Sequence, residues 1–148
     1  MTSSLAAPPA ATPLGAWLLA ARPKTLPAAV SPVLVGSAVA WSEGGFHAVS
    51  AVAAFAVALL LQIAANLAND VADFRRGADT AERLGPVRVT QSGLIRPERV
   101  AMATTAVLVL VAIPGLYLVW RGGWVLAGLG LLAMLAAVVY TAGPKPFG

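Results

Sequence analysis

The residues best suited to chemistry lie where a long apolar segment gives way to acids and arginines. Asn66, Asn69 or Asp70, and Asp73 follow one another at spacings of three and four residues, so they share one face if a helix continues through them. Asp79 adds a further carboxylate a short way along the chain. Amide and carboxylate oxygens, without thiols or imidazoles, suit Mg²⁺, which usually binds one or two carboxylates together with substrate phosphate. The pattern therefore predicts catalytic residues and a magnesium site in this stretch.

Four arginines close to these acids could bind the phosphate oxygens that a metal ion leaves free. These candidates for substrate binding are Arg75, Arg76, Arg83 and Arg88. A solvated loop with surface ion pairs is the alternative, and it suffices for Glu82. For Asn69 and Asp73 we favour a functional role, because polar groups at the end of an apolar helix normally face a cavity or a partner. Asn66 and Gln62 stay open, since they could line the site or only hydrogen-bond a neighbouring helix.

The composition of the chain indicates that this polar cluster is held in a membrane. Of 148 residues, 59% are hydrophobic and only 11% are charged, and the mean hydropathy is +0.82. Eleven of the sixteen charged residues fall between Asp70 and Arg99. This composition disfavours a soluble domain, a disordered chain and a nucleic-acid-binding module. The net charge of +4 fits lysines and arginines that collect in cytoplasmic loops.

Uncharged runs long enough to cross a bilayer predict an all-α fold, a multi-pass transmembrane helical bundle with four spans. The expected spans are 26–42, 48–69, 98–119 and 123–141, with a charged catalytic loop at 70–97. Residues 14–21 could form a short interfacial helix before the first span. Residues 1–13, rich in Ala, Pro, Ser and Thr, are expected to be a disordered leader, which leaves 14–148 as the membrane domain.

The distribution of basic residues predicts the orientation of the bundle. Nine of the ten lysines and arginines lie on the side that holds the N-terminus, the 70–97 loop and the C-terminus, and only Arg121 lies on the other. We therefore expect the N-terminus and the aspartate-rich loop to be cytoplasmic. An aromatic belt is expected at the opposite interface, formed by Trp41, Phe46, Trp120 and Trp124.

The run Asn69-Asp-x-x-Asp73 resembles the first aspartate-rich motif of the UbiA superfamily of intramembrane prenyltransferases. The wider superfamily has another Asp four residues later, where this chain has Gly77, and here the acid follows as Asp79. That departure is itself similar to the branch of the superfamily that makes menaquinone. Three further stretches resemble that branch, namely Ala21-Arg-Pro-Lys-Thr-Leu-Pro27, Gly85-Pro-Val-Arg88 followed by Gln91-Ser-Gly93, and Tyr140-Thr-Ala-Gly-Pro-Lys-Pro-Phe147.

The resemblance implies a bundle of about nine helices in the bacterial plasma membrane, around a cavity that opens to lipid. Two aspartate-rich motifs would hold Mg²⁺ and the diphosphate of a polyprenyl donor. By carry-over, the metal ligands are Asn69, Asp73 and Asp79, with Asp70 as a helper. The ring of 1,4-dihydroxy-2-naphthoate would attack the allylic cation and lose its carboxylate as carbon dioxide, giving demethylmenaquinone. Arg22 and Lys24 could recognise this acidic acceptor or could anchor the chain at the interface.

One departure from the family concerns the second aspartate-rich motif. Neither this motif nor the helices that carry it have a counterpart in these residues. We therefore expect residues 14–148 to be the N-terminal portion of a larger enzyme, with a C-terminal half as partner, and to be inactive alone. Transfer to another aromatic acceptor by the same fold is an alternative. A CDP-alcohol phosphotransferase fits less well, because Phe74 stands where that class needs Gly. A small transporter or scaffold subunit is the non-enzymatic alternative.

Overall fold

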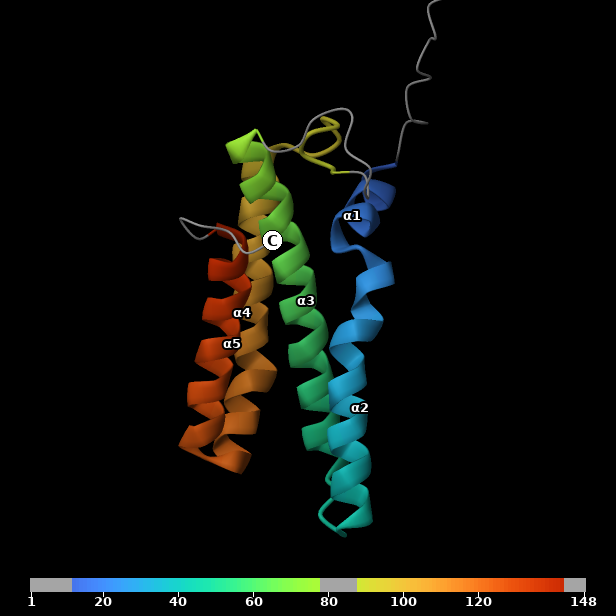
Figure 1. Cartoon of the computed structure of the whole chain (residues 1–148), viewed down its shortest axis with the longest axis vertical. Coiled ribbons are helices and arrows are strands. Elements are labelled where there is room, and N and C mark those ends of the chain that lie inside the picture. The colour runs from blue at the N-terminus through green and yellow to red at the C-terminus, as the bar shows by residue number, and fades with distance from the viewer. Residues whose placement is uncertain (1–11, 78–87, 143–148) are drawn as a thin grey trace, which may run out of the picture.

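The computed structural model describes residues 12–77 and 88–142, and all regular structure in these ranges is helical. The predicted all-α, multi-pass helical fold is confirmed (Figure 1). Its helices in chain order are α1 (Pro13–Ala21), the 3₁₀ helix η1 (Pro23–Thr25), α2 (Leu26–Ser42), α3 (Ala48–Arg76), α4 (Pro97–Gly122) and α5 (Trp124–Ala142).

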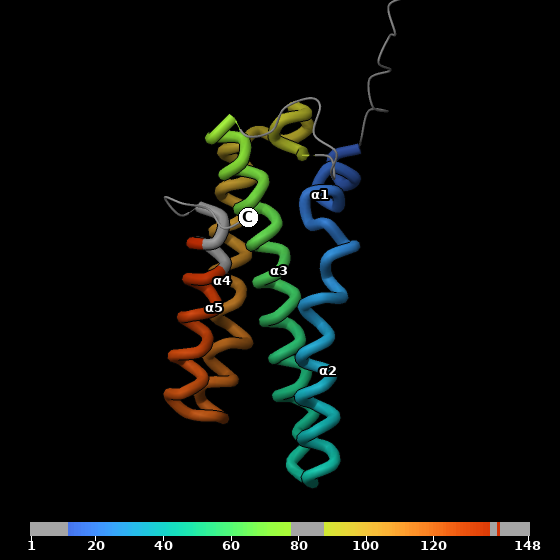
Figure 2. Tube along the Cα trace, in the orientation of Figure 1, coloured from blue at the N-terminus to red at the C-terminus, as the bar shows by residue number. Residues whose placement is uncertain are grey.

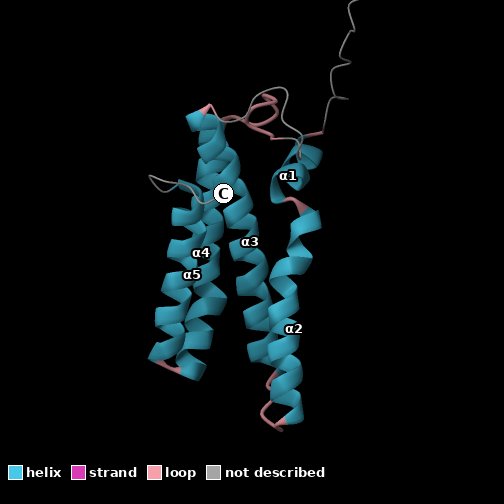
Figure 3. Cartoon of the chain, in the orientation of Figure 1, coloured by secondary structure: helices cyan, strands magenta, loops and turns pink. Residues whose placement is uncertain are grey.

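Helix α3 is the centre of the arrangement. It contacts α1, α2, α4 and α5, with the most extensive packing against α4. In Figure 2, α1 and α2 run along one side of α3, and the antiparallel pair α4 and α5 lies on the other. Figure 3 shows the connections between helices at the two ends of the bundle, apart from the short link between α1 and α2. The residues at the C-terminal end of α3 therefore meet α1 and the start of α4 at one end.

The helices have the length and composition of membrane spans. Three segments qualify, namely Pro13–Ser42, Ala48–Arg76 and Pro97–Gly122, and the described part of α5 adds a shorter apolar helix. In the most apolar stretch of each span, no more than 11% of the residues are buried. Apolar side chains that point outward in such numbers need lipid or further protein around them. The chain is an integral membrane protein.

The first span is interrupted near its beginning. Arg22 adopts a left-handed backbone conformation, with φ 50° and ψ 68°, between α1 and η1. Pro23 follows directly, and proline cannot donate the backbone hydrogen bond that would continue α1. The hydroxyl of Thr12 caps the start of α1 by accepting a hydrogen bond from the Gly15 N–H at 3.2 Å. Eleven residues of the predicted leader, 1–11, lie outside the described residues.

Helix α3 runs beyond the predicted span end at residue 69 and stops at Arg76. Residues 70–76, which the sequence placed in a loop, are therefore the last two turns of a helix. The helix ends there because Gly77 takes a left-handed conformation with φ 62°, and its N–H donates to the Phe74 carbonyl at 3.1 Å. Charged residues near the end of a membrane helix can reach the interface, so they do not terminate it.

The buried core lies at this same end, where α1, α3, α4 and the segment before α4 meet. Its members are small or β-branched residues and leucine, and they come from all four parts: Ala16, Ala20, Leu67, Val71, Val89, Ile95 and Val100. Val89 and Val100 are fully buried. This core fixes the positions of the polar side chains described next.

Candidate functional site

The polar residues singled out at the end of α3 do lie on one helical face. Gln62, Asn66, Asn69, Asp70 and Asp73 fall within the single continuous helix that the spacing required. Asn66 and Asp70 are buried, with 3% and 1% of their surfaces exposed, and Asn69 and Asp73 are half-buried. Within this acidic stripe, as we call the five residues, two are therefore turned into the protein and three, including the half-buried Gln62, stay accessible.

The carboxylate of Asp70 holds the chain segment that precedes α4. Its Oδ2 accepts a hydrogen bond from the Val89 N–H at 3.0 Å, and its Oδ1 accepts one from the Thr90 N–H at 3.2 Å. The Thr90 hydroxyl also donates to Oδ1. Carboxylates accept hydrogen bonds without donating any, so three converging donors suit this group. Both carboxylate oxygens of Asp70 thus accept hydrogen bonds from the protein, two from backbone N–H groups and one from a hydroxyl.

The carboxylate of Asp73 pairs with a basic side chain from the same segment. Arg88 Nη2 donates to Asp73 Oδ2, and the two side chains are 11% and 19% exposed. A guanidinium with so little exposure is screened less by solvent than one on an open surface. Arg88, one of the arginines predicted to bind substrate, is thus brought to the acidic stripe from another segment of the chain.

A second polar cluster attaches the interrupted first span to α3. Asn66 Nδ2 donates to the Ala21 carbonyl at 2.9 Å and to Thr25 Oγ1 at 2.8 Å. The Thr25 hydroxyl donates to the Arg22 carbonyl at 2.9 Å. Gln62 Nε2 lies 3.4 Å from both Thr25 Oγ1 and Asn66 Oδ1. Asn66 and Gln62 therefore both hydrogen-bond across to the neighbouring helical segment, and a role of Asn66 in substrate binding stays a prediction.

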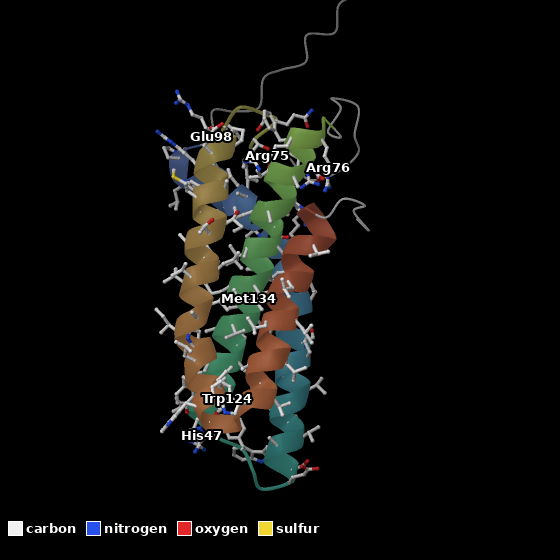
Figure 4. All side chains as sticks on the ribbon, turned by 90° about the vertical axis from the view of Figure 1, so that its left-hand side faces the viewer. His47, Arg75, Arg76, Glu98, Trp124 and Met134 are labelled. Carbon is white, nitrogen blue, oxygen red and sulfur yellow. The ribbon has the colours of Figure 1, made fainter. Side chains whose placement is uncertain are left out.

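The remaining basic candidates lie at the same end in different surroundings. Arg22 is half-buried and Lys24 is exposed, both beside the break between α1 and α2. Arg75 and Arg76 are exposed and line a groove of about 290 Å³ between α3 and α4, with Ala68, Val71, Ala72, Ala101 and Thr104. Figure 4 shows Arg75, Arg76 and Glu98 at one end of the bundle and His47 and Trp124 at the other.

The donor set for Mg²⁺ is partial in the part of the chain that is described. Within 12–77 and 88–142, no three Asp, Glu, His or Cys residues gather as a metal cluster would require. Asn69 and Asp73 are one turn apart and offer hard oxygen ligands of the kind that magnesium takes alongside substrate phosphate. The predicted third ligand, Asp79, and the predicted phosphate-binding Arg83 lie outside the described residues. Magnesium binding stays a prediction.

Two residues that the sequence did not single out have clear structural roles. Thr25 joins α1, η1 and α3, and Thr90 joins the segment before α4 to Asp70. Each lies within or beside a stretch noted for its resemblance to the menaquinone branch, 21–27 and 85–93. That coincidence was the available signal, although it carried no information about which atoms meet.

Comparison with known proteins decides the family. The model of the UbiA prenyltransferase family matches residues 29–148. The chain belongs to the UbiA prenyltransferase family. It is 42% identical over 139 residues to the 1,4-dihydroxy-2-naphthoate octaprenyltransferase of Escherichia coli, a match that covers 90% of this chain and 45% of that protein. The proteins of the same name from Haemophilus influenzae and Mycobacterium tuberculosis are 36% and 41% identical, with 89% of this chain and 46% and 45% of those proteins covered.

The UbiA family chain described here thus spans about 45% of the length of the curated relatives that it matches. No solved structure matches it. Within the family match lie the whole acidic stripe of α3, Arg88 and the segment anchored by Asp70. The arrangement brings an accessible carboxylate, an accessible amide and a guanidinium to one point at the end of a membrane helix.

Proposed function

We propose that this chain forms the diphosphate-binding part of a membrane enzyme that transfers a polyprenyl group from an isoprenoid diphosphate to 1,4-dihydroxy-2-naphthoate. The observation that carries the proposal is the Asp73–Arg88 pair on the acidic stripe of α3, in a chain whose relatives are named 1,4-dihydroxy-2-naphthoate octaprenyltransferases. Carboxylates and an arginine at one point suit a metal-bound diphosphate, because carboxylates bind the metal cation and arginine binds the phosphate oxygens.

The reaction breaks the bond between the first prenyl carbon and the diphosphate oxygen, and the electron pair leaves with the diphosphate. The naphthoate ring carbon that bears the carboxylate then bonds to the allylic carbon, and loss of carbon dioxide restores the aromatic ring. The products are the quinol form of demethylmenaquinone, carbon dioxide and diphosphate. Negative charge develops on the leaving diphosphate as positive charge develops on the allylic carbon, so fixed positive groups near the diphosphate should lower the barrier.

Asn69 and Asp73, together with Asp79, would hold Mg²⁺ in the proposed site. When bound, the ion supplies positive charge that offsets the charge developing on the diphosphate. Arg88 would donate N–H groups to diphosphate oxygens, a geometry that the planar guanidinium favours. Arg22 and Lys24, exposed or half-buried at the same end of the bundle, would attract the carboxylate of the acceptor.

The site needs more than this chain in our proposal. The chain covers about 45% of each matched relative, and we place a second aspartate-rich motif on helices in the remaining length of the enzyme. The proposed orientation places the Asp73 end in the cytoplasm, which nine of the ten basic residues support. Water-soluble diphosphate would then leave into the cytoplasm, while the prenyl tail stays in lipid.

The test uses the protein encoded by the complete open reading frame that contains this chain, reconstituted in lipid with a series of prenyl diphosphates and 1,4-dihydroxy-2-naphthoate. Asp73→Asn keeps the size of the side chain and removes its charge, and we expect it to lower magnesium-dependent transfer by about 100-fold or more. Glu98→Gln removes an exposed acid at the same end and serves as the matched control. Unchanged transfer by Asp73→Asn, or wild-type protein that transfers no prenyl group, would refute the proposal.

A further inference from the structure

Asp70 is the most buried acid of the stripe, and its carboxylate is turned toward the segment before α4. Only 1% of the residue is exposed. The N–H groups of Val89 and Thr90 donate to its two oxygens at 3.0 and 3.2 Å, and the Thr90 hydroxyl donates to Oδ1. Because these donors occupy both oxygens, the side chain is arranged as an acceptor for protein groups.

The anchored residues are the immediate neighbours of Arg88. Asp70 and Asp73 lie three residues apart on α3, so they point to the same side of adjacent turns. One of them holds the backbone of residues 89 and 90, and the other receives the guanidinium of Arg88. A short stretch of backbone therefore links the Asp70 anchor to the ion pair.

The anchored segment is also closed upon itself. The Ser92 N–H donates to the Arg88 carbonyl at 3.0 Å, and the Ile95 N–H donates to the Val89 carbonyl at 3.1 Å. Val89 and Ile95 are both buried in the core. These contacts fix the position of the Arg88 Cα relative to α3. The arginine therefore loses less conformational freedom when it binds an anion.

We propose that Asp70 is a positioning residue, which acts on the proposed diphosphate site through Arg88 and not as a ligand of metal or substrate. The inference rests on the proposed function and separates two adjacent acids of one motif by role. It also predicts that a carboxylate is needed at this position. In Asp70→Asn one oxygen becomes an NH₂ group, which faces a backbone N–H and cannot accept its hydrogen bond.

A double-mutant cycle tests whether Asp70 acts through Arg88. We expect Asp70→Asn to lower kcat/KM for the prenyl diphosphate by about 10-fold and Arg88→Gln by about 100-fold. If Asp70 works only by placing Arg88, the double variant should match Arg88→Gln alone, because nothing is left to position. A ligand role for Asp70 predicts instead that the two losses multiply, to about 1,000-fold, and that result would overturn the inference.

Amide hydrogen exchange supplies a readout that does not depend on turnover. We expect the N–H groups of Val89 and Thr90 to be protected in the wild type and in Arg88→Gln, and to exchange faster in Asp70→Asn. Thr90→Ser keeps the hydroxyl donor, so the exchange rates of these N–H groups should stay closer to those of the wild type in Thr90→Ser than in Thr90→Val. Unchanged protection in Asp70→Asn overturns the inference.

The two proposals fail in distinguishable ways. A wild-type protein without any prenyl transfer refutes the proposed function, and hydrogen exchange then still decides whether Asp70 anchors residues 89 and 90. An active wild type with multiplicative losses refutes the positioning role alone. Glu98 is an exposed acid in the first turn of α4. The variant Glu98→Gln therefore controls for the general effect of removing a negative charge at this end.

Discussion

Removing the hydroxyl of Thr25 should loosen the attachment of the first span to α3. Thr25 Oγ1 donates to the Arg22 carbonyl at 2.9 Å and accepts from Asn66 Nδ2 at 2.8 Å. Thr25→Val replaces the hydroxyl by a methyl group of similar size, so it removes these hydrogen bonds without opening a cavity. Thr25→Ser keeps the hydroxyl and loses only the methyl group, which makes it the matched control.

The expected loss of stability can be worked out from these contacts. A neutral hydrogen bond contributes about 1 kcal/mol net in soluble proteins, and about 0.6 kcal/mol between membrane helices. Two bonds of normal length are lost, and the contact with Gln62, at 3.4 Å, adds little. Asn66 still donates to the Ala21 carbonyl at 2.9 Å. We therefore expect Thr25→Val to lower the free energy of unfolding by about 1–2 kcal/mol, and Thr25→Ser by less than about 0.8 kcal/mol.

The assay is reversible unfolding of the protein in detergent micelles with a denaturing detergent, followed by the helical circular dichroism signal. Residues 1–148 contain no cysteine, so within them a pair of introduced cysteines on α1 and α3 would be the only sites for spin labels. The distribution of distances between the labels should broaden in Thr25→Val and stay narrow in Thr25→Ser. If Thr25→Val unfolds like the wild type and keeps a narrow distance distribution, the cluster around Thr25 does not attach the first span to α3.

Two further predictions follow from the helix end and from the charge distribution. Gly77 is left-handed with φ 62°, and an added Cβ would meet no atom within 4 Å, so Gly77→Ala should cost about 1–2 kcal/mol in the same unfolding assay through backbone strain alone; equal stability would show that α3 can end without glycine. For the orientation, Glu43→Cys should react with an impermeant thiol reagent in intact cells, whereas Glu98→Cys should react only after lysis. The reverse labelling pattern would contradict the proposed topology.

The sequence predicted the helical spans well where charge and proline mark their ends. The expected span 26–42 coincides with α2, because Pro27 lies at its beginning and charged Glu43 follows its last residue. It did not predict the full length of α3, since hydropathy falls at Asp70 although the backbone continues helical for two more turns. The signal for the true end was local, at Gly77.

The division of roles within the acidic stripe could not be read from the sequence. Spacing places Asp70 and Asp73 on one side of a helix, but it cannot say which of them meets a backbone and which meets a guanidinium. That depends on how residues 88–95 dock, through bonds between residues 19 and 20 positions apart. The same holds for Asn66 and Thr25, whose contact spans 41 positions. The metal role predicted for Asn69, Asp73 and Asp79 remains a prediction.

The anchoring of Val89 and Thr90 by Asp70 has a consequence for how this family can vary. The backbone is fixed at Gly77, where α3 ends, and again at Val89, so residues 78–87 join two points whose positions do not depend on the length between them. Closing a longer connection costs little, about 0.6 kcal/mol for each doubling of its length. The ion pair of Arg88 with Asp73 should therefore survive a change in the length of this connection, whereas the proposed metal ligand Asp79 lies within the connection and depends on that length.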